Sequence, residues 1–413
     1  MIPRRRPRFY QGEFKDLLKS IFQKKVAEGG AVEVFENKFA EYIGVKFAIA
    51  TCSGRSAMEL LLDSLGVKKG DEIIMPAYTL RDLKKIIEDK GLVPKFVDIE
   101  EDSFNINPNL IEGEVTKNTK AIIATHIFGL PCNIKKIGEI AQKHNLVVIE
   151  DCAHAVGAEI AGKKVGSFGA GAFFSLETTK LINTFGGGMV TTNNPAVNSW
   201  IRKRVEKYPV YPGKILKKIF FSYLEHLIII SPLYRLLNLL FMFKATTKII
   251  SKFYLIFHGR ARVAKSRLAN IQALFGLGQL RCLDQRNAVR NKIAAEFNKA
   301  LDGAVFPQKT NFTAQKRVYY FYTVNLGKIN NLEYLRKKLL VNGVDAGIKN
   351  EITDNCVISE KERFKFPVVN KLFYQIIQLP IYDRLTQKDI LFISNKIKKS
   401  LSCLRLQKAN LTK

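Results

Sequence analysis

The sequence is poor in acidic residues and has no closely spaced cysteines. Of its 413 residues, 66 are Lys or Arg and only 37 are Asp or Glu, so the formal net charge is +29 at pH 7. This excess favours an anionic partner, which can be nucleic acid, an anionic membrane surface or a phosphorylated substrate. Nucleic acid is the weakest of the three, because no basic recognition motif or aromatic stacking platform accompanies the lysines. The six cysteines are scattered without a C-x-x-C pair, which argues against a metal site and against a disulfide framework.

The sequence also lacks an apolar run long enough to span a membrane. A spanning helix needs about 20 consecutive apolar residues, and Pro232 and Arg235 interrupt the most apolar stretch. The start, residues 1–7, is basic, but no apolar segment follows it, so we expect no signal peptide. Together with the scattered cysteines, these absences predict a cytoplasmic protein.

What the sequence does contain is a regular alternation of apolar runs and helical patterns, which predicts an α/β fold. Between residues 31 and 194, short apolar runs are separated by helix-length segments, as is typical of a mostly parallel sheet with flanking crossover helices. A chain of 413 residues is long enough for two or three domains. We expect an N-terminal arm (1–30), a large α/β domain (31–207), a basic apolar helical insert (208–264), interdomain helices (265–305) and a smaller C-terminal α+β domain (306–413).

The insert, residues 208–264, is apolar and basic at the same time. Between Lys214 and Lys265 the only acidic residue is Glu225. One interpretation is a pair of helices that lie on an anionic membrane surface, at the inner membrane face, with an apolar side and a cationic side. The other is a buried helical hairpin or an oligomer contact. The sequence leaves both open.

One lysine and one aspartate carry the strongest chemical signal. Asp151 ends the apolar run at residues 146–150, and Lys180 lies in a Ser/Thr-rich turn before the glycines at 186–188. A pyridoxal phosphate (PLP) enzyme needs such a pair: the lysine forms the Schiff base, and the carboxylate holds the proton on the pyridine nitrogen. The ordinary alternatives are a surface lysine and a helix-capping aspartate. The combination of Asp151 with Lys180 nevertheless predicts Lys180 as the catalytic residue.

Two further segments add contacts for the same cofactor. Ser53 and Gly54 follow an apolar run and open a helical pattern, where backbone N–H groups and a hydroxyl can cradle a phosphate. His154 follows Asp151 closely and can stack on a flat ring or donate a hydrogen bond near its 3-oxygen. Each signal alone is more often structural, but with Asp151 and Lys180 they complete a PLP site.

The chain resembles the DegT family of PLP-dependent sugar aminotransferases, which have the aspartate aminotransferase-like type I fold. The resemblance implies a homodimer with active sites at the subunit interface, L-glutamate as amino donor and a nucleotide-linked keto sugar as acceptor, for a surface glycan or polysaccharide. It implies cofactor contacts from Ser53, Gly54, Arg55, Asp151, His154, Ser175, Lys180 and Lys265. The stretches that carry the resemblance are 34–44, 53–54, 70–79, 126–129, 150–158, 175–180, 187–189, 267–273 and 379–382.

Several positions near the expected cofactor depart from the family pattern. Arg55 stands where the family usually has Thr, so it adds charge to the phosphate site or points elsewhere. Leu80 replaces an aromatic residue, and Lys265 replaces an asparagine that reaches the partner subunit's phosphate. These changes leave two rivals: a PLP-dependent sugar dehydratase or lyase, and a PLP-binding regulatory protein without transaminase activity. Lys180 argues against the known dehydratase branch, which has a histidine there. A lipid-linked keto sugar is a further candidate acceptor.

Overall fold

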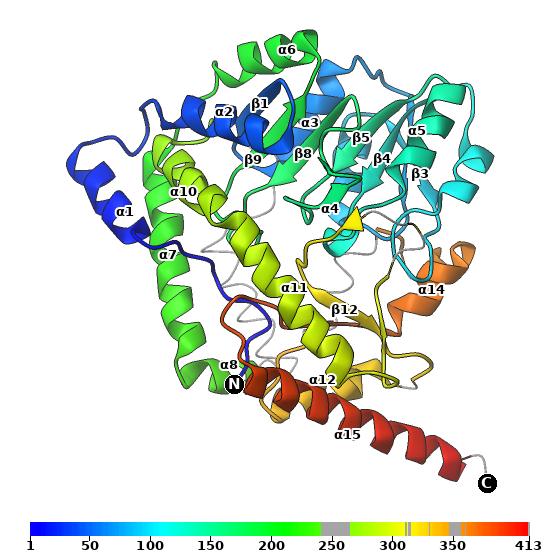
Figure 1. The fold of residues 1–413 in the computed structure, drawn as a ribbon. Coiled ribbons are helices and arrows are strands. Elements are labelled where there is room, and N and C mark those ends of the chain that lie inside the picture. Colours follow the sequence, from blue (N-terminus) through cyan, green and yellow to red (C-terminus); the bar gives the residue numbers. More distant parts are fainter. Residues whose placement is uncertain are drawn as a thin grey trace.

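The computed structural model describes residues 1–240, 265–309, 312, 315–329, 331–346, 357–359 and 361–411. Residues 241–264, which form the second half of the expected insert, lie outside the described residues. Figure 1 shows a large α/β layer structure, a smaller C-terminal part below it, and two helices along one side.

The centre of the large part is a seven-stranded sheet. Six strands run parallel, and only β9 is antiparallel to both of its neighbours. The prediction of a mostly parallel sheet is therefore confirmed. In spatial order the strands are β1 (Phe47–Thr51), β9 (Gly188–Thr192), β8 (Gly171–Ser175), β5 (Val147–Asp151), β4 (Thr119–Thr125), β2 (Glu72–Pro76) and β3 (Val93–Val97).

Helices cover both faces of this sheet because its strands are apolar on both sides. Successive side chains of a strand point to opposite faces, and Ile122 and Ile123 accordingly belong to two different core clusters. α2 (Ala31–Ile43) and α5 (Ile134–Lys143) pack on one face. α3 (Gly54–Ser64), α4 (Arg81–Asp89) and α6 (Pro195–Val205) pack on the other. The expected flanking helices are confirmed.

The C-terminal part is built on a small antiparallel sheet of β10 (Phe306–Pro307), β12 (Tyr322–Asn325) and β13 (Ile376–Leu379). α11 (Leu283–Ala300), α12 (Leu332–Val341) and α15 (Gln387–Leu411) pack against it around one apolar core. α10 (Asn270–Arg281) precedes α11, and the two helices meet at Cys282. Shorter elements are β6 (Glu159–Ile160), β7 (Lys163–Lys164), β11 (Gln315–Lys316), α14 (Pro367–Phe373), η1 (Pro108–Leu110), η2 (Glu112–Glu114), η3 (Ile127–Gly129) and η4 (Arg363–Lys365).

The N-terminal arm and the insert lie together along one side of the molecule. α1 (Glu13–Phe22) and α7 (Pro212–Ile230) are neighbours in Figure 1, and α8 (Leu233–Leu240) follows α7 after a bend. Only Ile219 and Ser222 of α7 are buried, so in the single chain this helix lies on the surface. Among the described helices, none combines the length and the apolar character that crossing a membrane requires.

Candidate active site

The sheet brings Asp151 and Lys180 to the same edge. Asp151 ends β5, and Lys180 follows the end of the neighbouring parallel strand β8. Asp151 is 6% exposed, and its Oδ1 accepts a hydrogen bond from the Ala153 N–H at 3.0 Å. Burial raises the pKa of Asp151, although this hydrogen bond and the charge of Lys180 act in the opposite direction.

The buried carboxylate of Asp151 has no ion-pair partner among the described residues. An unpaired buried carboxylate is unfavourable, and a cationic group beside it would stabilise it. A protonated pyridine nitrogen is such a group. Asp151 therefore fits the role that a PLP ring requires.

A stack of flat rings lies beside Lys180. Its Nζ is 4.6 Å from the ring centroid of Tyr320, and Tyr320 stacks on His154 with centroids 4.1 Å apart and planes 13° apart. Phe128 lies on His154 at 5.9 Å, also nearly parallel. Burial, followed by the charge of Lys180, lowers the pKa of His154 well below its usual value, so the imidazole is neutral. Stacked planar groups next to a lysine suit a flat cofactor.

The residues of the predicted phosphate cradle lie close together. Ser53 caps α3, and its Oγ accepts a hydrogen bond from the Ser56 N–H at 3.1 Å. Gly54 packs against β8 so closely that an added Cβ would lie 3.0 Å from the Ser175 Cβ. An added Cβ on Gly188 would lie 2.4 Å from the Ser53 carbonyl carbon. The glycine run thus lets Ser53, Gly54 and Ser175 meet.

Two predicted cofactor residues have surroundings in the single chain that differ from those of Ser53 and Gly54. Arg55 Nη1 lies 2.7 Å from Asp82 Oδ2 on α4, so its guanidinium is paired with a carboxylate. Lys265 is exposed, and no described contact joins it to Ser53 or Lys180. Their roles toward the cofactor remain predictions.

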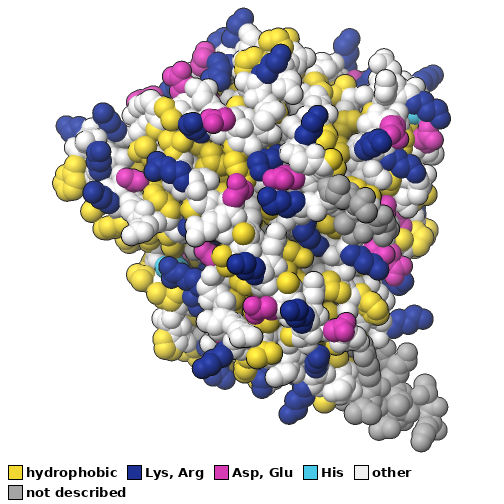
Figure 2. All heavy atoms as spheres, viewed as in Figure 1, with side chains coloured by type: hydrophobic (Ala, Val, Ile, Leu, Met, Phe, Trp, Pro, Cys, Tyr) yellow, Lys and Arg dark blue, Asp and Glu magenta, His cyan; other side chains and the backbone are white. Residues whose placement is uncertain are grey.

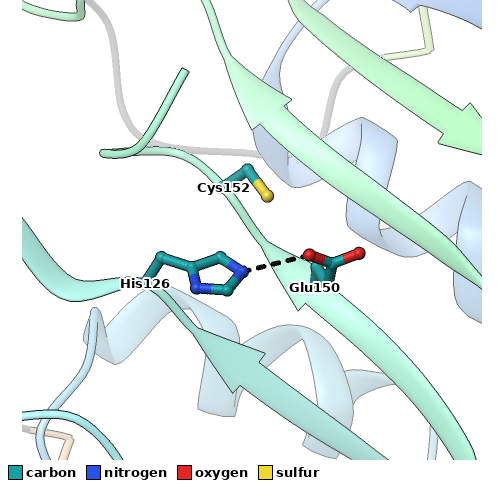
Figure 3. A group of neighbouring side chains, drawn as sticks. All are labelled: His126, Glu150 and Cys152. Atoms are coloured by element: carbon teal, nitrogen blue, oxygen red, sulfur yellow. Dashed lines mark hydrogen bonds and ion pairs between the residues drawn. The ribbon is translucent and has the colours of Figure 1, made fainter. Parts of the chain in front are cut away.

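A second buried group, Glu150 with His126 and Cys152, anchors the end of β5 (Figure 3). The two carboxylate oxygens of Glu150 accept hydrogen bonds from the backbone N–H groups of Gly166, Phe168 and Gly169 and from His126 Nε2. The other ring nitrogen of His126 accepts from the Cys132 N–H at 3.1 Å. Because these lone pairs are engaged, we interpret the group as a structural support for Asp151.

We predict that Glu150→Gln lowers the free energy of unfolding by at least about 2 kcal/mol. The amide nitrogen would face backbone N–H donors that have no other acceptor in this buried place, and each unpaired buried donor costs about 1–3 kcal/mol. Urea unfolding of the variant and of Glu139→Gln, on the outer side of α5, would measure the difference. Equal midpoints for the two variants would contradict the anchoring role.

Tyr320 and Arg8 were not among the predicted site residues. Tyr320 comes from the segment before β12, and the guanidinium of Arg8 donates a hydrogen bond to the Lys180 carbonyl oxygen. The arginine-rich start of the chain was visible in the sequence, but nothing local connects it with a lysine so far along the chain.

Fold and site together define a PLP-dependent aminotransferase. The model of the DegT/DnrJ/EryC1/StrS aminotransferase family matches residues 9–212 and 242–398, and the chain belongs to this family. The predicted fold, cofactor and class of activity, a PLP-dependent sugar aminotransferase, are confirmed.

Similar proteins cover most of the chain. The GDP-perosamine synthase of Caulobacter vibrioides is 32% identical over 312 residues, which are 73% of this chain and 70% of that protein. The dTDP-3-amino-3,6-dideoxy-alpha-D-galactopyranose transaminase of Aneurinibacillus thermoaerophilus is 28% identical over 92% of this chain and 93% of its own. Among solved structures, the putative sugar aminotransferase Spr1654 from Streptococcus pneumoniae in its PMP form superposes with a TM-score of 0.80 at 18% identity, covering 99% of both chains.

Proposed function

We propose that this aminotransferase moves an amino group from L-glutamate to a nucleotide-linked keto sugar, for a surface glycan or polysaccharide. The observation that carries the proposal is the placement of Lys180 beside a flat ring stack and a buried carboxylate without an ion pair. The acceptor class is supported by two relatives that are named for nucleotide-linked compounds, one of them a galactopyranose.

Each residue then has a defined task. When bound, PLP supplies a ring that accepts electrons from the reacting carbon. Asp151 holds the proton on the ring nitrogen, because its buried charge favours a cation beside it. Lys180 Nζ first attaches the cofactor and then moves the proton at the reacting carbon of the substrate. His154 stays neutral and packs flat, and the start of α3 with Ser53 and Gly54 binds the phosphate.

We propose a homodimer as the active form. Lys265 is exposed in the single chain, and in a dimer its ammonium group can act as a point charge on the phosphate bound by the other subunit. Arg55, held by Asp82 in the single chain, adds positive charge near the same end of α3.

The test of the function is a two-step reaction with the purified holoenzyme. L-Glutamate should convert the cofactor to the pyridoxamine form, and a panel of nucleotide-linked and lipid-linked keto sugars should return it to the starting form with release of an amino sugar, detected by mass spectrometry. If glutamate converts the cofactor but no keto sugar of the panel returns it to the starting form, the acceptor belongs to another class of compound. Release of a deoxygenated sugar would indicate the dehydratase, and no conversion by any amino acid would indicate the regulatory protein.

We further propose that α1 and α7 form a surface that docks on an anionic membrane, at the inner membrane face of the cytoplasm. Figure 2 shows hydrophobic and Lys or Arg side chains interleaved over these helices. The exposed apolar residues recur at helical spacing and are Phe14, Leu18, Ile21 and Phe22 of α1, and Phe220, Leu224, Leu227 and Ile230 of α7. Lys15, Lys19, Lys214 and Lys217 are exposed on the same two helices. Such a surface binds lipid by apolar burial and by attraction to anionic headgroups.

We predict that the full chain floats with vesicles containing phosphatidylserine and stays behind with purely zwitterionic ones. Phe220→Glu with Leu227→Glu should lower the bound fraction at least about tenfold, since two buried apolar contacts are lost and two negative charges added. Phe364→Glu, at another exposed aromatic residue, is the matched control. If the double variant floats like the wild type, the assignment of α1 and α7 as a membrane-docking surface is wrong. If the variant instead loses a concentration-dependent oligomer, the surface is a protein contact.

A further inference from the structure

The arginine-rich N-terminal arm passes directly beside the reactive lysine. Arg8 is 8% exposed, and its guanidinium donates a hydrogen bond to the carbonyl oxygen of Lys180. Its own carbonyl oxygen accepts from Asn183 Nδ2 at 3.1 Å and from Gln279 Nε2 at 2.8 Å. The arm is thus fixed from both sides, and the position of Arg8 is set by the fold.

Arg5 brings a second positive charge to the ring stack. Its guanidinium carbon lies 4.7 Å from the ring centroid of Phe321, the residue after Tyr320. Although burial acts in the other direction, the charges of Lys180, Arg5 and Arg8 lower the pKa of Tyr320 to about 7. The surroundings of the stack therefore favour negative charge.

A third arginine comes from α11. Arg290 is 1% exposed, and none of its three guanidinium nitrogens has a hydrogen-bond partner among the described residues. The charge of Arg290 acts on Arg8 and lowers its pKa, after the larger effect of burial. The geometry agrees: one turn earlier on α11, Arg286 donates a hydrogen bond to the carbonyl oxygen of Phe9, the residue after Arg8, so the arm and this face of α11 meet in one region.

The acidic side chains that the structure describes around these arginines do not balance their positive charge. Asp383 acts on both Arg8 and Arg290, but it also faces Arg286, whose Nε is 3.7 Å from its Oδ2. Glu225 faces Arg5. A buried guanidinium with unused donors is unfavourable unless an anion binds it. Carboxylates suit it best, because its planar donors pair with both of their oxygens.

We propose that Arg8 and Arg290, assisted by Arg5, bind the carboxylates of the amino donor and select a dicarboxylic amino acid. The inference rests on the proposed function. The hydrogen bond from Arg8 to the main chain of Lys180 puts the anion beside the amine that reacts. In an amino acid, the carboxylate is one bond from the reacting carbon. In a nucleotide-linked keto sugar, the sugar ring separates the diphosphate from the ketone, so a donor carboxylate fits this place better.

The test compares Arg8→Gln, Arg290→Gln and Arg290→Lys with Arg6→Gln. Arg6 is the matched control, because it lies on the same arm but over the ring of Tyr382, 5.2 Å from the centroid. Single-turnover absorbance measurements give the half-saturating concentration of L-glutamate, of L-alanine and of the keto sugar acceptor. Calorimetric titration of the holoenzyme with glutarate, which has both carboxylates and no amine, gives a readout independent of turnover.

We expect Arg8→Gln and Arg290→Gln each to raise the half-saturating concentration of L-glutamate about 30-fold or more and to weaken glutarate binding similarly. Arg290→Lys keeps the charge without the planar donors. Its half-saturating concentration of L-glutamate should lie between that of the glutamine variants and that of the wild type. The half-saturating concentration of L-alanine should rise in fewer of the variants, because L-alanine has one carboxylate. The half-saturating concentration of the keto sugar acceptor should be the same in all variants. Arg6→Gln should match the wild type in every measurement.

Wild-type glutarate affinity in both glutamine variants would overturn the proposal, as would an effect confined to the acceptor, which would assign the arginines to the diphosphate. If the wild type converts no amino acid at all, the proposed function fails, and the glutarate titration still decides whether the arginines form a dicarboxylate site. Thermal unfolding of Arg290→Gln and Arg290→Lys separates a folding defect from lost binding. The proposal also requires that Arg8→Gln loses glutarate affinity.

Discussion

Lys180→Ala is expected to abolish the glutamate-dependent conversion of the cofactor, lowering its rate by at least about 10⁴-fold. Two functions are lost together, the amine that attaches the cofactor and the base that moves the proton, and each contributes orders of magnitude to such a reaction. The Nζ of Lys180 is the amine that lies over the ring stack, 4.6 Å from the Tyr320 centroid. Stopped-flow absorbance with the holoenzyme measures the rate.

The same variant should still bind PLP, because Ser53, Gly54 and Asp151 remain in place. Lys203→Ala, at an exposed lysine of α6, is the matched control and should react like the wild type. If Lys180→Ala converts the cofactor at more than about a hundredth of the wild-type rate, the catalytic assignment is wrong.

Asp151→Asn should reduce the rate of the same half-reaction by about 10³-fold. The amide oxygen can still accept the hydrogen bond from the Ala153 N–H, so the end of β5 keeps its shape. The negative charge is lost, however, and the proton on the ring nitrogen loses the group that stabilises it in a buried place. We expect weaker PLP binding as well, measured by spectral titration.

Asp63→Asn is the control for a lost carboxylate. Asp63 is a partly exposed carboxylate whose Oδ1 lies 2.5 Å from the Nζ of Lys90, and Glu59 remains as a second partner of that lysine. This variant should keep the wild-type rate and the wild-type affinity for PLP. A wild-type rate in Asp151→Asn would remove Asp151 from the mechanism.

Local patterns were sufficient to predict the fold. The apolar runs at residues 72–75 and 121–124 are strands β2 and β4, because apolar side chains on both faces need a covered sheet. Asp151 could be placed from the sequence for the same reason: the carboxyl end of a parallel strand is where ligands bind.

The parts of the site that could not be predicted are contacts between distant segments. The hydrogen bond from Arg8 to Lys180 joins residues 172 positions apart, and the stack of Tyr320 on His154 joins the C-terminal part to the large sheet. No spacing rule links such positions. Whether Arg55 turns to the phosphate or to Asp82 depends on a neighbour on α4, which only the folded chain shows. The domain limits at 207, 264 and 305 remain predictions.

The measurement that tests the central claim most directly is the absorbance of the wild-type holoenzyme during one turnover with L-glutamate, followed by addition of a nucleotide-linked keto sugar. We predict loss of the absorbance of the lysine-bound cofactor, appearance of the pyridoxamine form, and recovery of the first spectrum as the amino sugar is released. A spectrum that glutamate leaves unchanged, in a protein shown to contain PLP, would contradict the assignment of this chain as a glutamate-dependent sugar aminotransferase.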